Sequence, residues 1–447
     1  MSTRSGRDYR VIDSKVGSHI FAVNGSRLFD VDPATAREVS ALLAAPGSGA
    51  DASLDAAFGS PRQYIDDTIP DLPPVRAISL NVAQSCNLGC TYCYADTGLF
   101  GGGARLMSLE TARQTVDRLL AEADPGDDIV VGFMGGEPLL NRKVVHDATT
   151  YAARRAAQNG RRARFSITTN ATLLSEADAD LFREYRFNVT ISLDGPREVN
   201  DRLRPTKAGG SSYDDAIRGL KRTLDKGGPG QVSARVTVTQ GSHDLAGILR
   251  HLIDLGVGDA GFAPVQVSPA PELEFQRTDF GPFLDEMIKC GEVAKAALLE
   301  GKRFPFSNFE TALNEIHRGS HRPYPCGAGA AYLSVNAEGD LYGCHRLIDA
   351  DGWKMGTITN GPDNEARAAH LARRHVDKQE PCRSCWARYL CGGGCYHEID
   401  RRGRQHCDYV RGWLEFCLAS YAELSARCPQ YFLNPNQYFS TPTPALS

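Results

Sequence analysis

Three cysteines lie close together early in the chain, in the run Gln84-Ser-Cys86-Asn-Leu-Gly-Cys90-Thr-Tyr92-Cys93-Tyr. This spacing offers three thiolates on one loop. Three thiolates on a cubane iron–sulfur cluster leave one iron without a protein ligand, and that iron can bind another molecule. A structural zinc site takes four protein ligands, often in two closely spaced pairs, and no fourth cysteine or histidine is near in the sequence. The run therefore favours an iron–sulfur site, with a zinc loop completed from afar as the alternative.

A second set of seven cysteines lies between residues 326 and 407. Their spacing includes Cys-x2-Cys, which alone favours a zinc site. The run then continues as Cys-x5-Cys-x3-Cys, a spacing that is not typical of a zinc ribbon. Two separate metal-bearing regions are therefore predicted. The second set consists of Cys326, Cys344, Cys382, Cys385, Cys391, Cys395 and Cys407.

Composition limits the classes of function. The 447 residues carry a net charge of −4, which predicts no general attraction to nucleic acid or to an anionic membrane surface. No apolar run is long enough for a membrane helix, and the chain begins without the apolar stretch of a signal peptide. These features predict a cytoplasmic protein. Clustered cysteines in such a reducing compartment indicate metal binding or catalysis more than disulfides.

Strand-like and helix-like segments alternate from Arg76 onward. Repeated strand–helix units predict an α/β fold with a parallel sheet, and six units suit a partial (β/α)6 TIM-like barrel with its site at the carboxyl ends of the strands. The strands are expected at 76–82, 128–133, 164–168, 187–193, 233–239 and 261–265. The helices are expected at 109–121, 143–158, 176–185, 213–224 and 246–255.

The flanking parts differ from this core. Residues 19–32 predict a hairpin with Asn24-Gly25 as its turn, followed by a helix at 33–43 that Asp32 caps. Residues 45–74 are expected to be a linker. After about Pro305 the alternation stops, little apolar periodicity remains, and only a short helix at 413–424 is expected. The predicted domains are a small α+β extension with linker (1–72), the barrel (73–305), a cysteine-rich domain (306–428) and a tail (429–447).

Short motifs follow four of the expected strands. Cys86 to Cys93 follow the first, Gly135-Gly136-Glu137-Pro138 the second, Thr168-Thr169-Asn170 the third, and Ser192-Leu-Asp194-Gly-Pro the fourth, with Arg204 shortly after. A Gly-Gly or Asp-Gly-Pro sequence alone could simply be a turn. Four such motifs in order, each at the end of an expected strand, are stronger evidence for a functional site. Cys-x3-Cys-x-aromatic-Cys after the first strand resembles the signature of the radical S-adenosylmethionine (SAM) superfamily, and the other three resemble further motifs of that family.

This resemblance implies a chemistry. The three cysteines would hold a [4Fe-4S] cluster whose open iron binds SAM, and reductive cleavage of SAM would yield methionine and a 5′-deoxyadenosyl radical. The family's glycine-rich motif meets the SAM amino group, and its serine and arginine hold the SAM carboxylate. The SAM-binding positions implied here are Tyr92, Gly135, Gly136, Glu137, Asn170, Ser192, Asp194 and Arg204.

The second cysteine set resembles the SPASM domain of radical SAM peptide and protein maturases, which binds two further [4Fe-4S] clusters. By that resemblance Cys382, Cys385, Cys391 and Cys407 would hold an outer cluster, with Cys417 as an alternative to Cys407. Cys326, Cys344 and Cys395 would hold an inner cluster. Cys290 and Cys428 are expected to be inert buried thiols.

Two departures narrow the function. Sulfatase-maturating relatives have an extra cysteine where this chain has Tyr332, and a catalytic aspartate where it has His345. An inner cluster with three ligands would keep an open iron. In thioether-forming relatives a substrate thiolate binds such a site. His345 is an acid/base candidate or an ordinary surface histidine.

Several segments together most resemble the maturation-protein family of quinohemoprotein amine dehydrogenase: Cys93-Tyr-Ala-Asp96, Gly98–Gly103, Gly132–Glu137 and Cys407–Trp413. That family links cysteine sulfur to methylene carbons of Asp or Glu. The resemblance implies a peptide or small-subunit substrate, a flavodoxin- or ferredoxin-type electron donor, and an N-terminal extension that grips a leader peptide or merely caps the fold. The alternatives are another radical SAM peptide modification and a zinc-stabilised scaffold without catalysis.

Overall fold

The computed structural model describes residues 8–45, 50–59, 68–225, 228–241 and 244–433. The chain divides into two compact units, each assembled from separate stretches. The unit within 71–275 and 327–371 is here named the barrel unit. The unit within 1–70, 276–326 and 372–447 is named the flanking unit. This division follows packing, so the domain bounds 1–72, 73–305, 306–428 and 429–447 stay predictions.

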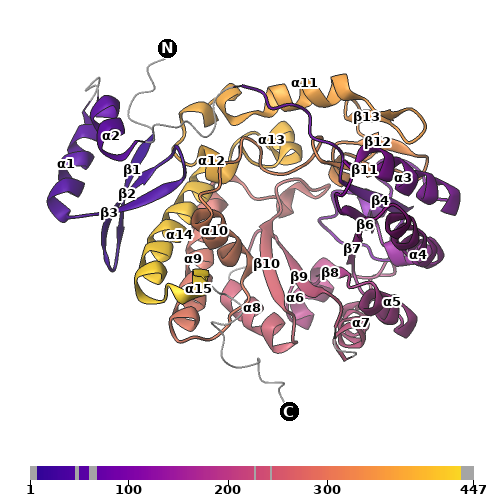
Figure 1. The fold of residues 1–447 in the computed structure, drawn as a ribbon. Helices are drawn as coiled ribbons and strands as arrows, with labels where there is room; N and C mark the ends of the chain where they lie inside the picture. Colours follow the sequence, from indigo (N-terminus) through magenta and orange to yellow (C-terminus); the bar gives the residue numbers. More distant parts are fainter. Residues whose placement is uncertain (1–7, 46–49, 60–67, 226–227, 242–243, 434–447) are drawn as a thin grey trace. The chain divides into compact units, whose positions relative to one another are not determined.

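The barrel unit is built on a mixed sheet whose central strands are parallel (Figure 1). The six predicted strands occur in sequence order across this sheet, and the five predicted helices follow them, all at nearly the predicted bounds. The α/β prediction with a partial barrel is therefore confirmed. The strands are β4 (Ala77–Gln84), β6 (Ile129–Gly135), β7 (Ala163–Thr169), β8 (Asn188–Ser192), β9 (Gln231–Val238) and β10 (Asp259–Pro264). The helices are α3 (Leu109–Glu122), α4 (Arg142–Gln158), α5 (Glu176–Glu184), α7 (Tyr213–Asp225) and α8 (Leu245–Asp254).

Local sequence explains why these elements form. Residues of β4 are buried along nearly the whole strand, as expected of a central parallel strand covered on both faces. Ser108 caps α3, and Ser175 closes a reciprocal capping box at the start of α5. Because the strands are parallel, their carboxyl ends lie at the same edge of the sheet. The cysteine loop and the other motifs follow the strands at this edge.

Two elements of the barrel unit differ from the prediction. The helix α6 (Arg197–Leu203) was not expected. No strand was predicted in the cysteine-rich region, but part of it extends the barrel sheet, with β11 parallel to β4 and pairing Tyr332 with Ala77. Strand β11 is only four residues long, too short to show the alternation of apolar and polar residues that marks a strand in a sequence. The added strands are β5 (Arg105–Leu106), β11 (Tyr332–Val335), β12 (Asp340–Tyr342), β13 (Lys354–Thr357) and β14 (Gly361–Pro362).

The flanking unit begins with a three-stranded antiparallel sheet of β1 (Tyr9–Ser14), β2 (Gly17–Ala22) and β3 (Arg27–Val31). The predicted hairpin is confirmed, with Gly25 at a positive φ of 95° in its turn. The predicted helix is α1 (Pro33–Ala44), and Asp32 caps it as expected. Strand β1 was not predicted.

The predicted linker at 45–74 is wrong in part, because it contains the helix α2 (Ala50–Phe58). Its residue Leu54 is 2% exposed and packs in a small core with Tyr9, Ile20 and Val39. A single buried leucine among polar and small residues left no helical period in the sequence.

The remaining described α-helices all begin at or after Phe280. The expected short helix at 413–424 is instead a long one, α14, which begins at Cys407, and Trp413 packs against Phe306 and Phe309. The expected tail begins with a short helix, and its residues 434–447 lie outside the described residues. None of the described helices is long and apolar enough to cross a membrane. The elements are α9 (Phe280–Leu299), α10 (Ser307–His317), α11 (Asn364–Arg374, which spans the division between the units), α12 (Arg388–Cys391), α13 (Tyr396–Arg402), α14 (Cys407–Arg427) and α15 (Gln430–Leu433).

Candidate functional site

The first cysteine loop leaves the carboxyl end of β4 and is pinned by backbone hydrogen bonds. The amides of Gly89 and Thr91 donate to the carbonyls of Pro205 and Leu203, at 2.8 and 3.0 Å. The Leu88 amide lies 3.4 Å from the Cys86 sulfur. These bonds hold the loop against the segment that follows α6.

Two polar side chains approach the sulfurs from other strand ends. The Asn170 side-chain nitrogen, beyond β7, lies 3.8 Å from the Cys86 sulfur, and Arg204 Nη1 lies 3.9 Å from the Cys90 sulfur. Asn170 also donates to the Asn87 side chain at 3.0 Å. The structure therefore brings motifs of the first, third and fourth strands to one place, as the prediction required.

Burial holds two thiols of this loop in their neutral form. Burial raises the pKa of Cys86 to about 12 and that of Cys90 to about 11, where the positive charge of Arg204 opposes the shift. These thiols stay protonated at neutral pH unless a metal displaces the proton. Within the described residues, no three His, Cys, Asp or Glu side chains converge on a point for a single metal ion. A cubane cluster does not need such a point, because each thiolate binds a different iron.

Glu137 is fully buried at the end of β6 and is occupied by donors of its own chain. Its carboxylate accepts hydrogen bonds from the Leu139 amide, the Thr169 hydroxyl and the Asn170 amide, at 3.0, 2.7 and 2.8 Å. These bonds tie the end of β6 to the end of β7. Burial raises the pKa of Glu137 to about 7, although the three donors act in the opposite direction.

The two glycines before Glu137 allow a close approach of backbones. A Cβ on Gly135, whose φ is 151°, would lie 2.5 Å from the Ala83 carbonyl oxygen, and one on Gly136 would lie 2.3 Å from that of Ser85. Glycine is therefore required by the chain itself at these positions. Beside Gly135, the buried Asn81 amide has no hydrogen-bond partner among the described residues. An unpartnered buried amide is costly, so this end of the sheet is suited to a bound polar group.

The fourth motif forms a buried ion pair. Asp194, two residues after Ser192 ends β8, accepts from Arg204 Nε at 2.9 Å, the Tyr92 hydroxyl at 2.5 Å and the Thr237 amide at 2.9 Å. Asp194 is 1% exposed and Arg204 is 8% exposed. Through Tyr92 this network joins the cysteine loop to β8 and β9, a role that spacing alone did not reveal.

Removal of the Arg204 charge is expected to destabilise the barrel unit. Arg204→Leu leaves Asp194 buried without its cationic partner, which should lower the free energy of unfolding by about 3–5 kcal/mol. Anaerobic urea unfolding measures this loss. The exposed neighbour Arg202 on α6 is the matched control, since Arg202→Leu should change it by less than about 0.5 kcal/mol. Equal losses in the two variants would contradict the prediction.

The pKa of Glu137 predicts a pH dependence of stability. Because the pKa is raised in the folded state, the folded chain retains a proton that the unfolded chain has lost, and stability declines as the pH rises toward and through 7. Between pH 6 and 8, the free energy of unfolding of wild type should fall by about 1 kcal/mol relative to Glu137→Gln. The difference is measured by urea unfolding without added SAM. If the free energies of unfolding of wild type and Glu137→Gln change with pH in the same way, the pKa of Glu137 is not raised.

Residues 80–245 of the chain match the model of the radical SAM superfamily. The chain is an enzyme with a radical SAM domain. A serine-type anaerobic sulfatase-maturating enzyme of Klebsiella aerogenes is 25% identical over 74% of this chain and 82% of its own length.

Solved structures share the fold of the radical SAM domain and of the region around it. The protein anSMEcpe with bound AdoMet superposes with a TM-score of 0.68 at 20% identity, over 82% of this chain and 99% of that one. SuiB of Streptococcus suis, bound to its precursor peptide SuiA, has a TM-score of 0.53 at 14% identity, over 91% and 98%. At these identities the likeness concerns the fold.

Beside the radical SAM domain, the cysteine-rich residues of the barrel unit form a second polar cluster. The Tyr332 hydroxyl lies 2.7 Å from the Ser79 hydroxyl on β4 and 3.5 Å from His345 Nδ1. His345 Nδ1 lies 3.8 Å from the sulfur of Cys344. Burial raises the pKa of Tyr332, so its hydroxyl keeps its proton. The two residues that depart from the sulfatase-maturase pattern therefore lie together, beside a predicted cluster ligand.

Asp349 connects the two cysteine-bearing segments of the barrel unit. Its carboxylate accepts hydrogen bonds from Gln84 at 2.8 Å, from Arg105 at 3.1 Å and from Asn336 at 2.8 Å. Gln84 lies two residues before Cys86, and Asp349 lies five residues after Cys344. This carboxylate was not singled out in the sequence, because its partners are distant along the chain.

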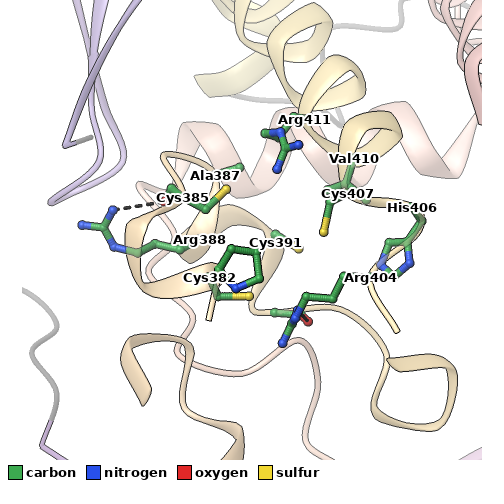
Figure 2. Close-up of a pocket in the computed structure, with 12 residues that line it drawn as sticks. Cys382, Cys385, Ala387, Arg388, Cys391, Arg404, His406, Cys407, Val410 and Arg411 are labelled. Carbon is green, nitrogen blue, oxygen red and sulfur yellow. Dashed lines mark hydrogen bonds between the residues drawn. The ribbon is translucent and has the colours of Figure 1, made fainter. Parts of the chain in front are cut away.

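In the flanking unit, the four cysteines predicted to hold an outer cluster line one pocket. Figure 2 shows Cys382, Cys385, Cys391 and Cys407 arranged around a common space. Cys417, the alternative to Cys407, is fully buried in α14 and does not line this pocket.

Arginines offset the charge that four thiolates would bring. Arg404 lines the pocket, with its guanidinium held by the Gly393 carbonyl at 2.8 Å and the Gln379 side chain at 2.5 Å. Burial raises the pKa of Cys382 to about 12 and raises that of Cys407, while Arg404 opposes both shifts. Thiols in this setting bind metal by releasing protons to solvent.

The predicted inner ligands are divided between the units. Cys326 and Cys395 belong to the flanking unit, where both lie near the buried Tyr396 and would raise its pKa if charged. Cys344 belongs to the barrel unit. Their joint role as an inner site stays a prediction. Cys290 is fully buried in α9, and Cys428 is 5% exposed.

Proposed function

We propose that this chain is a radical SAM maturase that joins cysteine sulfur to a side-chain methylene carbon of Asp or Glu within a peptide or small protein subunit. Such a reaction is that of the quinohemoprotein amine dehydrogenase maturation proteins. The observation that carries the proposal is the pairing of Tyr332 with His345 beside Cys344, where sulfatase maturases have an extra cysteine and an aspartate. The solved structures of anSMEcpe with a bound Cp18Cys peptide and of SuiB with its precursor peptide SuiA support a peptide as substrate.

The cofactors of the proposal are SAM and three [4Fe-4S] clusters. Cys86, Cys90 and Cys93 would hold the cluster that binds SAM. The pocket cysteines Cys382, Cys385, Cys391 and Cys407 would hold the outer one, and Cys326, Cys344 and Cys395 the inner one. Soft thiolate ligands favour iron–sulfur clusters over hard cations.

The chain's own residues hold SAM in place in this proposal. When bound, the first cluster supplies the electron that cleaves SAM to methionine and a 5′-deoxyadenosyl radical. The buried Asp194–Arg204 pair and the Glu137 bonds would keep the three strand ends rigid around SAM. The Asn81 amide, which has no hydrogen-bond partner among the described residues, lies beside Gly135. Rigid placement of the reacting groups contributes to the rate, because it fixes the geometry in which they react.

The proposed reaction balances as a loss of two hydrogens from the substrate. One hydrogen atom leaves the methylene carbon and joins the 5′-deoxyadenosyl group. The thiol loses a proton as its sulfur bonds to that carbon, and the auxiliary clusters, held by the cysteines named above, would accept the one surplus electron. A flavodoxin- or ferredoxin-type donor would supply the electron that starts each turnover.

Peptide recognition is proposed for the N-terminal sheet. Within the described residues β3 pairs with β2 and has no strand on its other edge. A strand of the substrate could add there, with main-chain hydrogen bonds providing affinity. A purely capping role for this sheet is the alternative, and it predicts that the sheet is dispensable for substrate binding.

Formylglycine formation is the second candidate, because a sulfatase-maturating enzyme is 25% identical to this chain. Oxidation of serine to formylglycine also removes two hydrogens, so the mass change alone cannot separate the two reactions. The number of free substrate thiols separates the two reactions. Thioether formation consumes a cysteine thiol, whereas oxidation of serine to an aldehyde leaves every thiol free.

The test uses anaerobic turnover with SAM and with candidate peptides that contain Cys together with Asp or Glu. The expected product is lighter by two hydrogens per crosslink, resists alkylation at the linked cysteine, and forms together with 5′-deoxyadenosine. Fragmentation should place each link between Cys and Asp or Glu. An aldehyde that reacts with hydrazide, or a link to an α-carbon, would refute the thioether assignment.

A further inference from the structure

The loop that carries the outer cysteines is braced by a buried arginine. Arg388 lies between Cys385 and Cys391, lines their pocket and has a side chain only 1% exposed. Its guanidinium donates to the Cys385 carbonyl at 3.1 Å, the dashed bond in Figure 2. The same guanidinium is paired with Asp8, immediately before β1. Asp8 is therefore one of two acidic partners of this charge inside the cysteine loop, and the other is Asp377, 3.6 Å from Arg388 Nε.

A second contact joins the same loop to the face of the sheet. The Trp386 ring, next to Cys385, lies 6.1 Å from the Phe21 ring of β2 in an edge-to-face arrangement. The Arg10 guanidinium of β1 lies 5.0 Å from the Trp386 ring centre. Arg10 also pairs with Glu415 at 2.6 Å, on the helix that begins at Cys407. The sheet thus touches both segments that supply pocket cysteines.

A third contact runs from the hairpin turn. The Ser26 hydroxyl donates to the Ser320 carbonyl at 2.8 Å. Two residues later, the Arg322 amide donates to the Tyr389 carbonyl at 3.1 Å, and its guanidinium bonds the Leu390 carbonyl. The turn is therefore linked, through one short segment, to the residues just before Cys391.

We propose that the N-terminal sheet, residues 8–31, positions the outer cysteine loop, residues 382–391, so that the sheet and the cluster held by that loop stabilise each other. The physical basis is the buried Arg388 charge, which needs acidic partners, and Asp8, immediately before β1, is one of the two. Coupling of this kind is reciprocal, because a change at either end alters the free energy of the other. A peptide strand bound at β3 would then act on the cluster through the same contacts. The inference rests on the proposed function for the presence of that cluster.

The experiment uses full-length holoenzyme in which Cys86, Cys90 and Cys93 are all replaced by alanine, so that only the auxiliary clusters remain. Asp8→Ala and Arg10→Ala are introduced together, and the release of iron to a ferrous chelator is followed. Release should be faster by at least about fivefold. The electron paramagnetic resonance spectrum of the reduced outer cluster should change as well.

Matched controls lie at the far end of β1 and in the turn that follows it. Asp13 and Lys15 are exposed residues that do not contact the cysteine loop, so Asp13→Ala with Lys15→Ala should leave iron release unchanged. If the Asp8 and Arg10 variant behaves like this control, the proposal is wrong. If both variants release iron equally fast, the effect is a general loosening of the sheet, and the proposal is also wrong.

The reciprocal measurement does not depend on an altered sheet. Cys382→Ser with Cys385→Ser removes the outer cluster from the otherwise intact chain. Amide hydrogen exchange in residues 9–31 should then increase by at least about fivefold, while exchange in β7 and β8 stays the same. Unchanged exchange in residues 9–31 would overturn the coupling.

Iron content separates failure of this inference from failure of the proposed function. If the background protein with wild-type sheet contains no iron that depends on Cys382 and Cys385, the outer cluster itself is absent and the proposed cofactor set is wrong. If that iron is present but insensitive to Asp8 and Arg10, only the coupling is wrong.

Discussion

Replacing Cys90 with alanine is expected to abolish the cleavage of SAM. Formation of 5′-deoxyadenosine should fall by about a thousandfold or more, equivalent to about 4 kcal/mol of activation free energy. The reason is that Cys90 is one of three thiols on the loop after β4, and a cluster held by two of them would lose its place beside Arg204. Anaerobic assays with dithionite and SAM, analysed by liquid chromatography, measure the product directly.

The matched control is another buried thiol far along the sequence. Cys290 is fully buried in α9 and lies outside both cysteine sets, so Cys290→Ala should retain SAM cleavage within about twofold, at the cost of a small cavity. Comparable losses in the two variants would indicate general damage to the protein. Full cleavage activity in Cys90→Ala would exclude the three-cysteine assignment.

The second large effect is expected at the outer pocket. Cys407→Ala should remove about four of roughly twelve irons per chain, because it breaks the four-thiolate set around the pocket. Cys417→Ala should remove none, because Cys417 is fully buried in α14 and does not line that pocket. Iron and sulfide analysis of the anaerobically purified variants shows whether Cys407 or Cys417 is the fourth ligand.

Both substitutions lie on the same helix, so each serves as the control for the other. The Cys417 side chain is more deeply buried than that of Cys407, so Cys417→Ala should disturb the packing of α14 more. This variant therefore shows whether disturbed packing of α14 is by itself enough to release iron. Iron loss in Cys417→Ala with retention in Cys407→Ala would reverse the ligand assignment. Retention in both would remove the outer cluster from the proposal.

Much of the radical SAM domain was predictable because its information is local. A strand needs only a few apolar residues in a row, and each motif directly follows its strand, so the order of motifs along the chain predicts their convergence at one sheet edge. The cysteine spacing itself specifies a three-thiolate loop. The contact of Arg204 with Cys90 and that of Asn170 with Cys86 agree with this expectation.

Other features depended on partners far apart in sequence. The burial of Glu137 among three donors, the Asp349 bonds to Gln84 and the pairing of β11 with β4 all join distant segments. No periodicity or spacing marks such pairs. The same holds for α2, whose single buried leucine packs against residues of the preceding sheet and helix.

The sequence by itself determined the class of chemistry, because the types and spacing of cysteines restrict which metals and how many ligands a loop can offer. It determined the strand–helix order of the barrel for the same local reason. Only the tertiary structure decided that Cys407 rather than Cys417 faces the outer pocket, and that Arg388 ties the cysteine loop to Asp8. These outcomes depend on which faces are buried and which charges meet, and burial is a property of the packed chain.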